Sequence, residues 1–220
     1  MSIRTSMPFD FIEPCLPTPS AHVPEGAMWV HEIKHDGYRL IVRRDGEGVR
    51  LFTRRGHDWT VKYPHIVEAM AALRAQSMTL DGEAVSCGAN GVSDFEQLHS
   101  QTHNDTVFLY AFDLLQLNGD DLRSEPLEVR KATLQSLLRK AKPGVRYNEH
   151  LNGDGEIIFK HACKLGLEGI VSKRRDFPYR SGRTKGWIKI KNPASAAMLR
   201  MAKSSGAKFS GAKFSGAKPD

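Results

Sequence analysis

Lys34 is the first residue whose type and setting could support covalent chemistry. It lies where an expected strand meets the Asp36-Gly37 pair, within the stretch HEIKHDGYR at residues 31–39. A lysine fixed at the end of a strand can act as a nucleophile when its ammonium loses its proton, which nearby positive charge or burial favours. The alternative is a solvent-facing lysine beside a hairpin, and this segment alone favours that plainer reading.

Asp81 and Glu83 form a pair of carboxylates separated by one residue in LDGEAV, residues 80–85. In a strand, the period of two residues places both on one face. Carboxylates held together repel each other unless a cation lies between them, so a divalent metal ion is their natural partner. Alternatively, Asp81-Gly82 forms a turn and Glu83 is exposed, and the segment alone does not decide between the two.

Lys189 and Lys191 share one face of an expected strand at residues 187–191, with Ile188 and Ile190 on the other face. Two lysines on the wet side of a strand can clamp a phosphate and stabilise the charge that develops on it. They could equally form the polar side of an edge strand, where lysine discourages aggregation.

Glu168 and Lys173 stand at the two ends of EGIVSK, just upstream of that strand. Because they are five residues apart, they point to opposite faces of an unbroken strand. Both can line one cleft only if Gly169 permits a bend or if Glu168 lies in the preceding loop.

The elements that must position these residues are short strands with a few helices between them. Two Asp-Gly pairs, at 36–37 and 45–46, predict a hairpin between strands 28–34 and 38–44 that continues into a strand at 49–53. Ser93 and Glu96 form a capping box that predicts the start of a short helix. Further strands are expected at 107–117, 169–174 and 187–191, and further helices at 65–76, 127–141 and 157–165. Antiparallel runs of strands with helices between them indicate an α+β fold rather than a doubly wound one.

Composition places the chain among ordinary soluble globular proteins: of 220 residues, 40% are hydrophobic and 26% are charged. No apolar run approaches the roughly 20 residues that cross a bilayer, and the first residues lack a signal-peptide core. The three cysteines, Cys15, Cys87 and Cys163, contain no CxxC pair, so neither a zinc site nor a disulfide framework is expected. We therefore expect a cytoplasmic protein with reduced thiols and no contact with membranes.

The net charge of +7 is concentrated near the C-terminal end. Residues 171–193 carry +7 and residues 194–220 carry +4, so the other 170 residues carry −4. This asymmetry suggests a polyanion bound from one side, although a run of charge is also typical of a solvated face. Residues 194–220 contain an SGAKF repeat from about Ser204, and we expect them to be a basic, low-complexity, disordered tail behind a domain at 1–193.

Six short motifs occur in an order that carries more information than any one of them: KxDGxR from Lys34, TRRG from Thr53, DGE from Asp81, FDL from Phe112, EGIVSK from Glu168 and WIKIK from Trp187. Together they resemble the ordered motifs of the covalent nucleotidyltransferases and, within that superfamily, an ATP-dependent DNA ligase. The stretches HEIKHDGYRL and YAFDLLQLNGDDLR are similar to the ligase module of bacterial non-homologous end-joining ligases, and the resemblance spans about residues 8–193.

This resemblance implies a nucleotidyltransferase domain built from two antiparallel β-sheets with flanking helices and a nucleotide cleft between them. The implied enzyme is an ATP-dependent DNA ligase, or its stand-alone adenylation domain, that joins 5′-phosphate to 3′-hydroxyl ends of nicked or broken double-stranded DNA in repair. It would act in the cytoplasm at the nucleoid, as a monomer, alongside other end-joining or repair proteins. ATP would donate AMP, with Mg²⁺ or Mn²⁺ as the metal ion.

The resemblance also implies roles around the nucleotide. Lys34 would attack the α-phosphate of ATP, release pyrophosphate and hold AMP as a phosphoramidate. The backbone around Glu32 and Ile33 would meet the edge of the adenine. Phe112 would stack on the face of the base, although its place in a row of aromatic residues also fits a plain core position.

Charged residues fill the remaining implied roles. Arg39 and Arg54 would hold the ribose and phosphates, or the 5′-phosphate of a nick. Glu83 would contact the ribose or the metal ion, and Glu168 would help to place that ion. Charge on the α-phosphate would be neutralised by three lysines, Lys173, Lys189 and Lys191. Phosphoryl transfer needs little beyond such alignment and charge neutralisation.

Two departures from the family pattern stand out. The residues after 193 are too few for the oligonucleotide-binding barrel that usually follows this domain, and Arg55 occupies a position that is often asparagine. The alternatives are an RNA ligase or a capping-type guanylyltransferase on the same scaffold, or a nucleic-acid-binding module without turnover.

Overall fold

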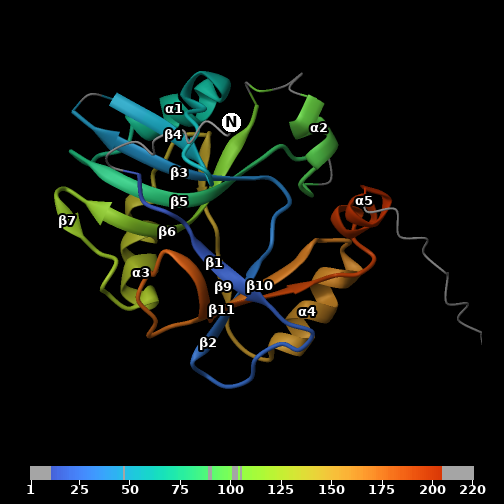
Figure 1. Cartoon of the computed structure of the whole chain (residues 1–220). Helices are drawn as coiled ribbons and strands as arrows, with labels where there is room; N and C mark the ends of the chain where they lie inside the picture. The colour runs from blue at the N-terminus through green and yellow to red at the C-terminus, as the bar shows by residue number, and fades with distance from the viewer. Residues whose placement is uncertain (1–10, 47, 89–90, 101–103, 105, 205–220) are drawn as a thin grey trace, which may run out of the picture.

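The computed structural model describes residues 11–46, 48–88, 91–100, 104 and 106–204. In this part of the chain two β-sheets lie next to each other, with helices packed around them (Figure 1). Sheet A has the strand order β1 (Cys15–Pro19), β11 (Gly182–Lys191), β10 (Gly169–Arg174), β2 (Trp29–Ile33) and β9 (His150–Leu151). Sheet B has the order β4 (Gly48–Thr53), β3 (Tyr38–Asp45), β5 (Met78–Val85), β6 (Phe108–Leu117) and β7 (Asp120–Asp121), with β8 (Val145–Tyr147) paired to β6.

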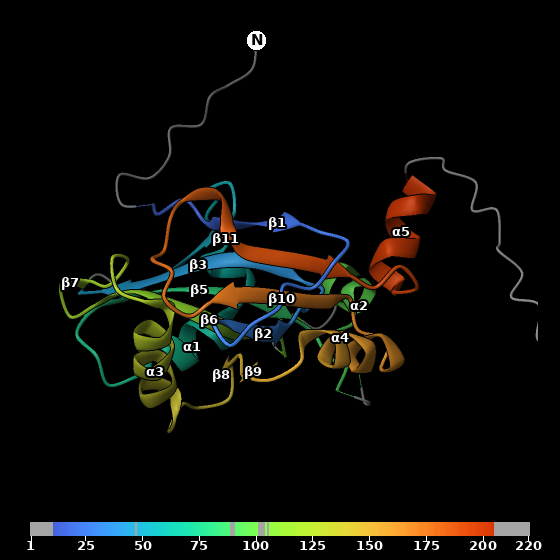
Figure 2. The ribbon, with the colours of Figure 1, turned by 90° about the horizontal axis from the view of Figure 1, so that it is seen from below.

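Three helices pack on these sheets. They are α1 (Pro64–Ala71) on β4, α3 (Leu127–Leu138) on β6 and α4 (Gly155–Lys164) on β10. The other helical elements of the described residues are η1 (Thr60–Lys62), α2 (Phe95–Ser100) and α5 (Ala196–Ser204). Figure 2 shows α3 and α4 at opposite ends of the molecule and α5 beside the end of β11. Within the described ranges, no helix has both the length and the apolar character needed to span a membrane.

The α+β class is confirmed, with one correction to the strand directions. Most neighbouring strands run antiparallel, but β1 pairs with β11, and β6 with β8, in parallel. The chain reaches β8 from β6 by way of α3, which is the kind of crossover that a parallel pair requires. Both parallel pairs join segments far apart in sequence, so no local pattern could reveal them.

The predicted hairpin around Asp36-Gly37 is wrong. Strand β2 belongs to sheet A and β3 to sheet B, so the chain crosses between the sheets at this point. Gly37 lies against the backbone of β5: a Cβ there would stand 2.1 Å from the carbonyl oxygen of Ala84. The glycine is therefore required for close backbone approach and not for a turn. The second Asp-Gly pair does form its hairpin, β3–β4, in which Asp45 lies opposite Gly48.

Most other predicted elements are confirmed, with shifted ends. Three strands and two helices lie where expected, as β6, β10, the end of β11, α3 and α4. Helix α1 stops at Ala71, where Arg44 Nη1 donates to carbonyl oxygens of the last turn and of the loop beyond it. Helix α2 is capped by Asp94, whose Oδ1 accepts a hydrogen bond from Gln97 N at 3.0 Å, and not by Ser93 as the capping box predicted.

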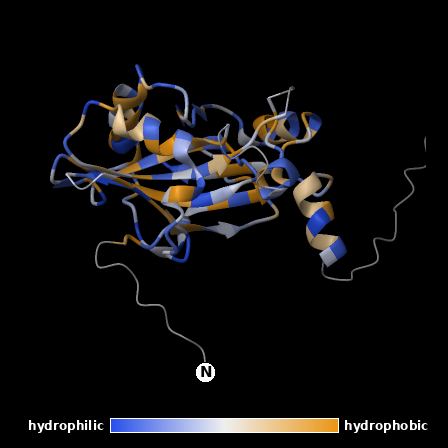
Figure 3. Ribbon diagram, turned by 90° about the horizontal axis from the view of Figure 1, so that it is seen from above, coloured by the Kyte–Doolittle hydropathy of each residue, from blue (hydrophilic) through white to orange (hydrophobic). Residues whose placement is uncertain are grey.

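Part of the predicted tail is helical. Helix α5 bears both hydrophobic and hydrophilic residues (Figure 3). Its Arg200 forms an ion pair with Asp36 and lies 4.8 Å from the ring centroid of Phe95. The expectation of disorder is therefore wrong for this segment, while the SGAKF repeats lie outside the described residues.

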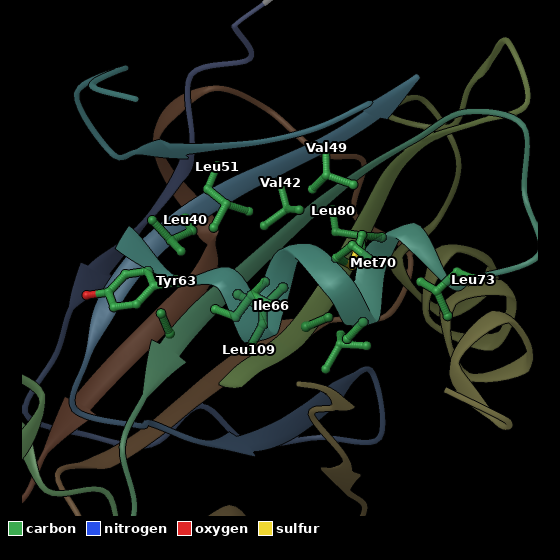
Figure 4. Packing of buried hydrophobic residues seen from close by; sticks show 14 of the residues in the cluster. Leu40, Val42, Val49, Leu51, Tyr63, Ile66, Met70, Leu73, Leu80 and Leu109 are labelled. Carbon is green, nitrogen blue, oxygen red and sulfur yellow. The ribbon is translucent and has the colours of Figure 1, made fainter. Parts of the chain in front are cut away.

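Of the three clusters of buried hydrophobic residues in the described part of the chain, two involve sheet B or both sheets. The larger one fills the space between sheet B and α1, and its members include Leu40, Val42, Leu51, Ile66, Met70 and Leu80 (Figure 4). The second draws on strands of both sheets and includes Ile41, Phe52, Phe112, Tyr179 and Trp187. This second cluster forms the base on which the candidate site is built.

Candidate active site

A small cavity of about 70 Å³ lies between the two sheets. Both sheets supply its walls, since β2, β10 and β11 of sheet A and β3, β5 and β6 of sheet B each carry lining residues. Seven residues singled out from the sequence line it: Glu32, Ile33, Lys34, Arg39, Glu83, Phe112 and Lys173. Motifs spread over more than 130 positions of sequence thus meet in one place.

A wider groove of about 930 Å³ adjoins this cavity and shares Arg39 and Glu83 with it. Arg54 lines the groove and not the cavity, together with Arg55, and both side chains are exposed at the end of β4. The cavity itself is below the roughly 300 Å³ of a typical ligand site. A ligand of nucleotide size therefore needs the side chains of the cavity to move, or extends into the groove.

Lys34 is surrounded by charged residues. Its Nζ lies 2.5 Å from Glu168 Oε2, and Lys191 Nζ lies 3.5 Å from the other oxygen of the same carboxylate. Burial, followed by the neighbouring charges of Lys191 and Lys34, lowers the pKa of Lys189. The structure thus places Lys34, Glu168, Lys189 and Lys191 in one cluster of cations around a carboxylate.

Glu168 reaches this cluster by both of the routes that its spacing from Lys173 required. It precedes β10, and Gly169 at the start of that strand has a φ of +141°. A Cβ at Gly169 would stand 2.0 Å from the carbonyl oxygen of Ile190, so only glycine fits here. The Gly169 carbonyl in turn accepts a hydrogen bond from the backbone N–H of Lys34 at 3.0 Å. The residue that forms the bend between Glu168 and β10 therefore also holds the backbone of Lys34, whose side chain pairs with Glu168.

Arg39 is held rigidly by Asp81. Its Nε and Nη2 donate to the two carboxylate oxygens of Asp81, both at 2.6 Å, and Nη2 also donates to the Cys15 carbonyl at 3.0 Å. The hydroxyl of Tyr179 donates to Asp81 Oδ2 at 2.6 Å. Asp81 is fully buried and does not line the cavity. The metal ion that the Asp81–Glu83 spacing suggested is therefore not expected between these two carboxylates.

Glu83 and Glu168 are the carboxylates that remain available to a cation. Burial raises the pKa of Glu83 to about 7, Lys34 and Arg39 oppose this shift, and Glu168 adds to it. Two neighbouring carboxylates suit a hard divalent ion, which bonds to oxygen. No group of three or more acidic, His or Cys residues that could hold a metal ion occurs in the described part of the chain. Mg²⁺ commonly takes one or two carboxylates and completes its shell with substrate phosphates and water, so the two glutamates suit such an ion.

Phe112 combines the two readings given to it from the sequence. Its ring lines the cavity and also packs edge-on against Trp187, with a centroid separation of 6.1 Å. The guanidinium of Arg39 and the ammonium of Lys173 lie 4.6 and 4.3 Å from the ring centroid. Stacking of a base on Phe112 stays a prediction. It requires the side chains of Arg39 and Lys173 to move away from the face of the ring.

Glu32 lies at the floor of the cavity and is fully paired, a feature that sequence reasoning missed. Its Oε1 accepts from Lys131 Nζ at 2.6 Å, its Oε2 lies 2.7 Å from Lys173 Nζ, and Asn148 Nδ2 donates to Oε2 at 3.2 Å. Burial acts to raise the pKa of Glu32, but the charges of Lys131 and Lys173 outweigh it and the pKa is lowered. Lys173 was expected among the phosphate-binding lysines, but its charge is paired with that of Glu32.

Arg130 and Lys131, two consecutive residues of α3, form ion pairs with both sheets. Arg130 makes a buried two-point ion pair with Asp113 of β6 in sheet B, at 2.7 and 2.9 Å. Lys131 pairs with Glu32 of β2 in sheet A. A sequence signal for both existed: they fall on the same helical face as Leu127 and Leu134, which is the buried face of α3.

His35 is a second lining residue that was not foreseen. Its ring stacks on Tyr110 with 3.9 Å between centroids, and its Nε2 lies 3.1 Å from Asn148 Oδ1. Burial lowers the pKa of His35 from 6.5 to about 4, against the opposing effects of Asn148 and Glu32. The folded protein thus keeps this ring neutral over a range in which the unfolded chain is protonated.

Acidification is therefore expected to destabilise the protein through His35. Between pH 6.5 and 4 the unfolded chain binds a proton that the folded chain does not, so the free energy of unfolding falls as the pH drops, by about 2 kcal/mol from this residue. His35→Gln should flatten the curve of unfolding free energy against pH, measured by urea denaturation at pH 7 and pH 4.5. His31 and His150, whose pKa values are also lowered by burial, stay in place in both proteins. An unchanged curve would contradict this assignment.

Comparison with protein families identifies one match. The model of the ATP dependent DNA ligase domain matches residues 17–191. Among curated proteins, the multifunctional non-homologous end joining protein LigD of Pseudomonas aeruginosa is 40% identical over 192 residues, covering 86% of this chain and 23% of that protein. The LigD protein of Mycobacterium tuberculosis H37Rv is 37% identical over 186 residues, covering 84% of this chain and 24% of that protein. The chain thus spans about a quarter of the length of these relatives.

Solved structures with the same fold include two mycobacterial ligases. Mycobacterial DNA ligase D complexed with ATP and MES is 36% identical, with a TM-score of 0.74 over 84% of this chain and 62% of that one. The ligase domain of M. tuberculosis LigD is 34% identical, with a TM-score of 0.69 over 81% of this chain and 60% of that one.

Proposed function

Because the chain belongs to the family of ATP-dependent DNA ligase domains, we propose that it transfers AMP from ATP to Lys34 and then to the 5′-phosphate of a DNA end. The strongest support is the position of Lys34. It lines a cavity between two sheets, in a cluster with Glu168, Lys189 and Lys191. A nucleophile, a nearby carboxylate and several cations are what the first step of ligation requires.

In that step the lone pair of Lys34 Nζ attacks the α-phosphorus. A P–N bond forms, the bond to the bridging oxygen of the β-phosphate breaks, and pyrophosphate leaves with its electron pair. The ammonium must first lose a proton, and the Glu168 carboxylate at 2.5 Å is in position to accept it. Lys189 and Lys191 offset the negative charge that grows on the α-phosphate.

Glu83 and Glu168 are the residues that would hold Mg²⁺ or Mn²⁺. When bound, the ion would supply positive charge against the phosphate oxygens of ATP. Burial of Glu83 keeps a proton on this carboxyl up to about pH 7 in the protein alone, so binding of a cation there releases that proton.

Nicked or broken double-stranded DNA is the proposed acceptor of the AMP. Arg54 and Arg55 line the groove that opens from the cavity and shares Arg39 with it, and exposed arginines are suited to the phosphates of a DNA strand. In the next steps the AMP would pass to the 5′-phosphate, and a 3′-hydroxyl would displace it to seal the strand. We place this activity in the cytoplasm at the nucleoid, for a monomer that works with other end-joining or repair proteins.

Labelling with radioactive nucleotide tests this function directly. The 220-residue chain is incubated with α-³²P-ATP and MgCl₂ and run on a denaturing gel, and a second reaction contains duplex DNA with a single nick. Label on the protein and a sealed strand are expected. Label from GTP but not ATP would indicate a capping-type enzyme, sealing of RNA alone would indicate an RNA ligase, and DNA binding without label would leave a binding module.

A further inference from the structure

Helix α5 follows the part of the chain that matches the ligase family, which ends at residue 191. It stands beside the end of β11 (Figure 2), and two of its side chains contact residues close to Lys34. Arg200 forms an ion pair with Asp36, two positions after Lys34. Met201 Sδ accepts a hydrogen bond from Lys191 Nζ at 3.3 Å. A helix outside the matched domain is thus in contact with the candidate active site.

The start of α5 is firmly anchored. Asn192 is buried, and its backbone N–H donates to the carbonyl oxygen of Glu168 at 2.9 Å. Ser195 is also buried, and its Oγ accepts from Met198 N at 3.3 Å, which caps the first turn of the helix. The helix is therefore fixed to the backbone of a residue in the site, which gives Arg200 a defined position.

The loop that carries Lys34 runs from sheet A to sheet B, and each of its residues contacts a different element. Strand β10 binds the backbone of Lys34, β6 packs on the ring of His35, and β5 packs on Gly37. These strands belong to the matched domain. The carboxylate of Asp36 is held from outside that domain, by Arg200 of α5.

We propose that Arg200 is a positioning residue for the transfer of AMP to Lys34, and that it acts through Asp36. This inference rests on the proposed function. The Arg200 guanidinium lies 4.8 Å from the ring centroid of Phe95, so a cation–π contact on one side and the carboxylate on the other restrict its movement. The guanidinium thereby holds the loop, and the loop directs the Lys34 amine toward the α-phosphorus.

The exposure of the pair indicates an effect on rate more than on stability. The side chains of Arg200 and Asp36 are 30% and 20% exposed, and ion pairs in contact with water contribute little to the free energy of unfolding. Alignment is far more sensitive, because a displacement of about 1 Å in a reacting group can slow a reaction by about 10²-fold. Removing Arg200 should therefore slow the chemical step in a protein that stays folded.

Arg200→Met tests this role in the full chain with α-³²P-ATP and MgCl₂. Label transfer is followed over a series of ATP concentrations, which separates the maximal rate constant from the half-saturating ATP concentration. We expect the rate constant to fall about tenfold and the half-saturating concentration to change less than about twofold, because the nucleophile loses its alignment while the contacts to ATP remain. Arg200→Lys, which keeps the positive charge, should recover part of the lost rate. Lys203→Met, at an exposed lysine in the last turn of α5, is the matched control and should label like wild type.

A double-variant cycle separates this role from a general effect of α5 on the fold. Asp36→Asn alone should slow labelling, and Arg200→Met should then cause little further loss, because the two residues act as one unit. Two losses that multiply would overturn the inference, as would a folded Arg200→Met variant with the wild-type rate constant. Wild type that takes no label from ATP rejects the proposed function and this role with it, whereas labelled wild type beside an unimpaired Arg200→Met variant rejects this role alone.

Discussion

Lys34→Ala should abolish formation of the covalent protein–AMP adduct. Without the amine no P–N bond can form, so label from α-³²P-ATP should fall at least about 10³-fold, to the background of the assay. Lys34→Arg should be equally inactive, because a guanidinium keeps its proton and has no nucleophilic lone pair at neutral pH. The measurement is the label retained on the protein after a denaturing gel.

Loss of label must be separated from loss of fold. The Lys34 side chain is 22% exposed and pairs with Glu168, so its removal should leave the circular dichroism spectrum unchanged. Lys185→Ala, at an exposed lysine of β11, is the control and should label like wild type. If Lys34→Ala is labelled normally, the nucleophile is elsewhere and the proposed first step is wrong.

The second large effect concerns stability. Asp113 and Arg130 are both 0% exposed and make two hydrogen bonds to each other. Asp113→Ala leaves the guanidinium buried without its counter-charge, at a cost of about 3–5 kcal/mol. In a chain of this size that should lower the midpoint of thermal unfolding by about 10 °C. Differential scanning calorimetry measures it.

A double variant shows whether the unpaired charge is the cause. Asp113→Leu combined with Arg130→Met removes both charges and should recover most of the lost stability, because a buried ion pair replaced by apolar residues is often neutral. Arg174→Met, at the exposed Arg174–Asp176 pair, should leave the midpoint unchanged. A double variant as unstable as Asp113→Ala would show that packing, and not charge, sets the loss.

Local sequence patterns predicted strands well where the residues of the strand itself determine how it packs. The alternation in WIKIK places Ile188 and Ile190 on one face, and in β11 both pack in one hydrophobic cluster. Trp187, on the face of the two lysines, is nevertheless buried in another cluster. Asp36-Gly37 shows the limit of such reasoning. The dipeptide favours a turn, but the glycine is required by a neighbouring strand whose contact residue, Ala84, lies 47 positions away.

The residues of the candidate site were likewise predicted in part from the sequence and in part not. Ordered motifs located Lys34, Glu83, Phe112 and Lys173 at one cavity. Pairings across the fold were invisible, above all the contact of Glu32 with Lys131, 99 residues apart. Arg130 and Lys131 share a helical face with Leu127 and Leu134, which is a signal of burial. Only the tertiary structure shows that they are buried against carboxylates.

Because both sheets are attached to α3, the ways in which substrates can bind and products can leave are restricted. Separating the sheets at this end would uncover the pairs of Arg130 and Lys131 together, and breaking even one buried pair costs several kcal/mol. A rigid-body motion that separates sheet A from sheet B is thus disfavoured. Exchange of nucleotide and pyrophosphate should instead proceed at the opposite end, through loop and side-chain rearrangements on the nanosecond-to-microsecond scale.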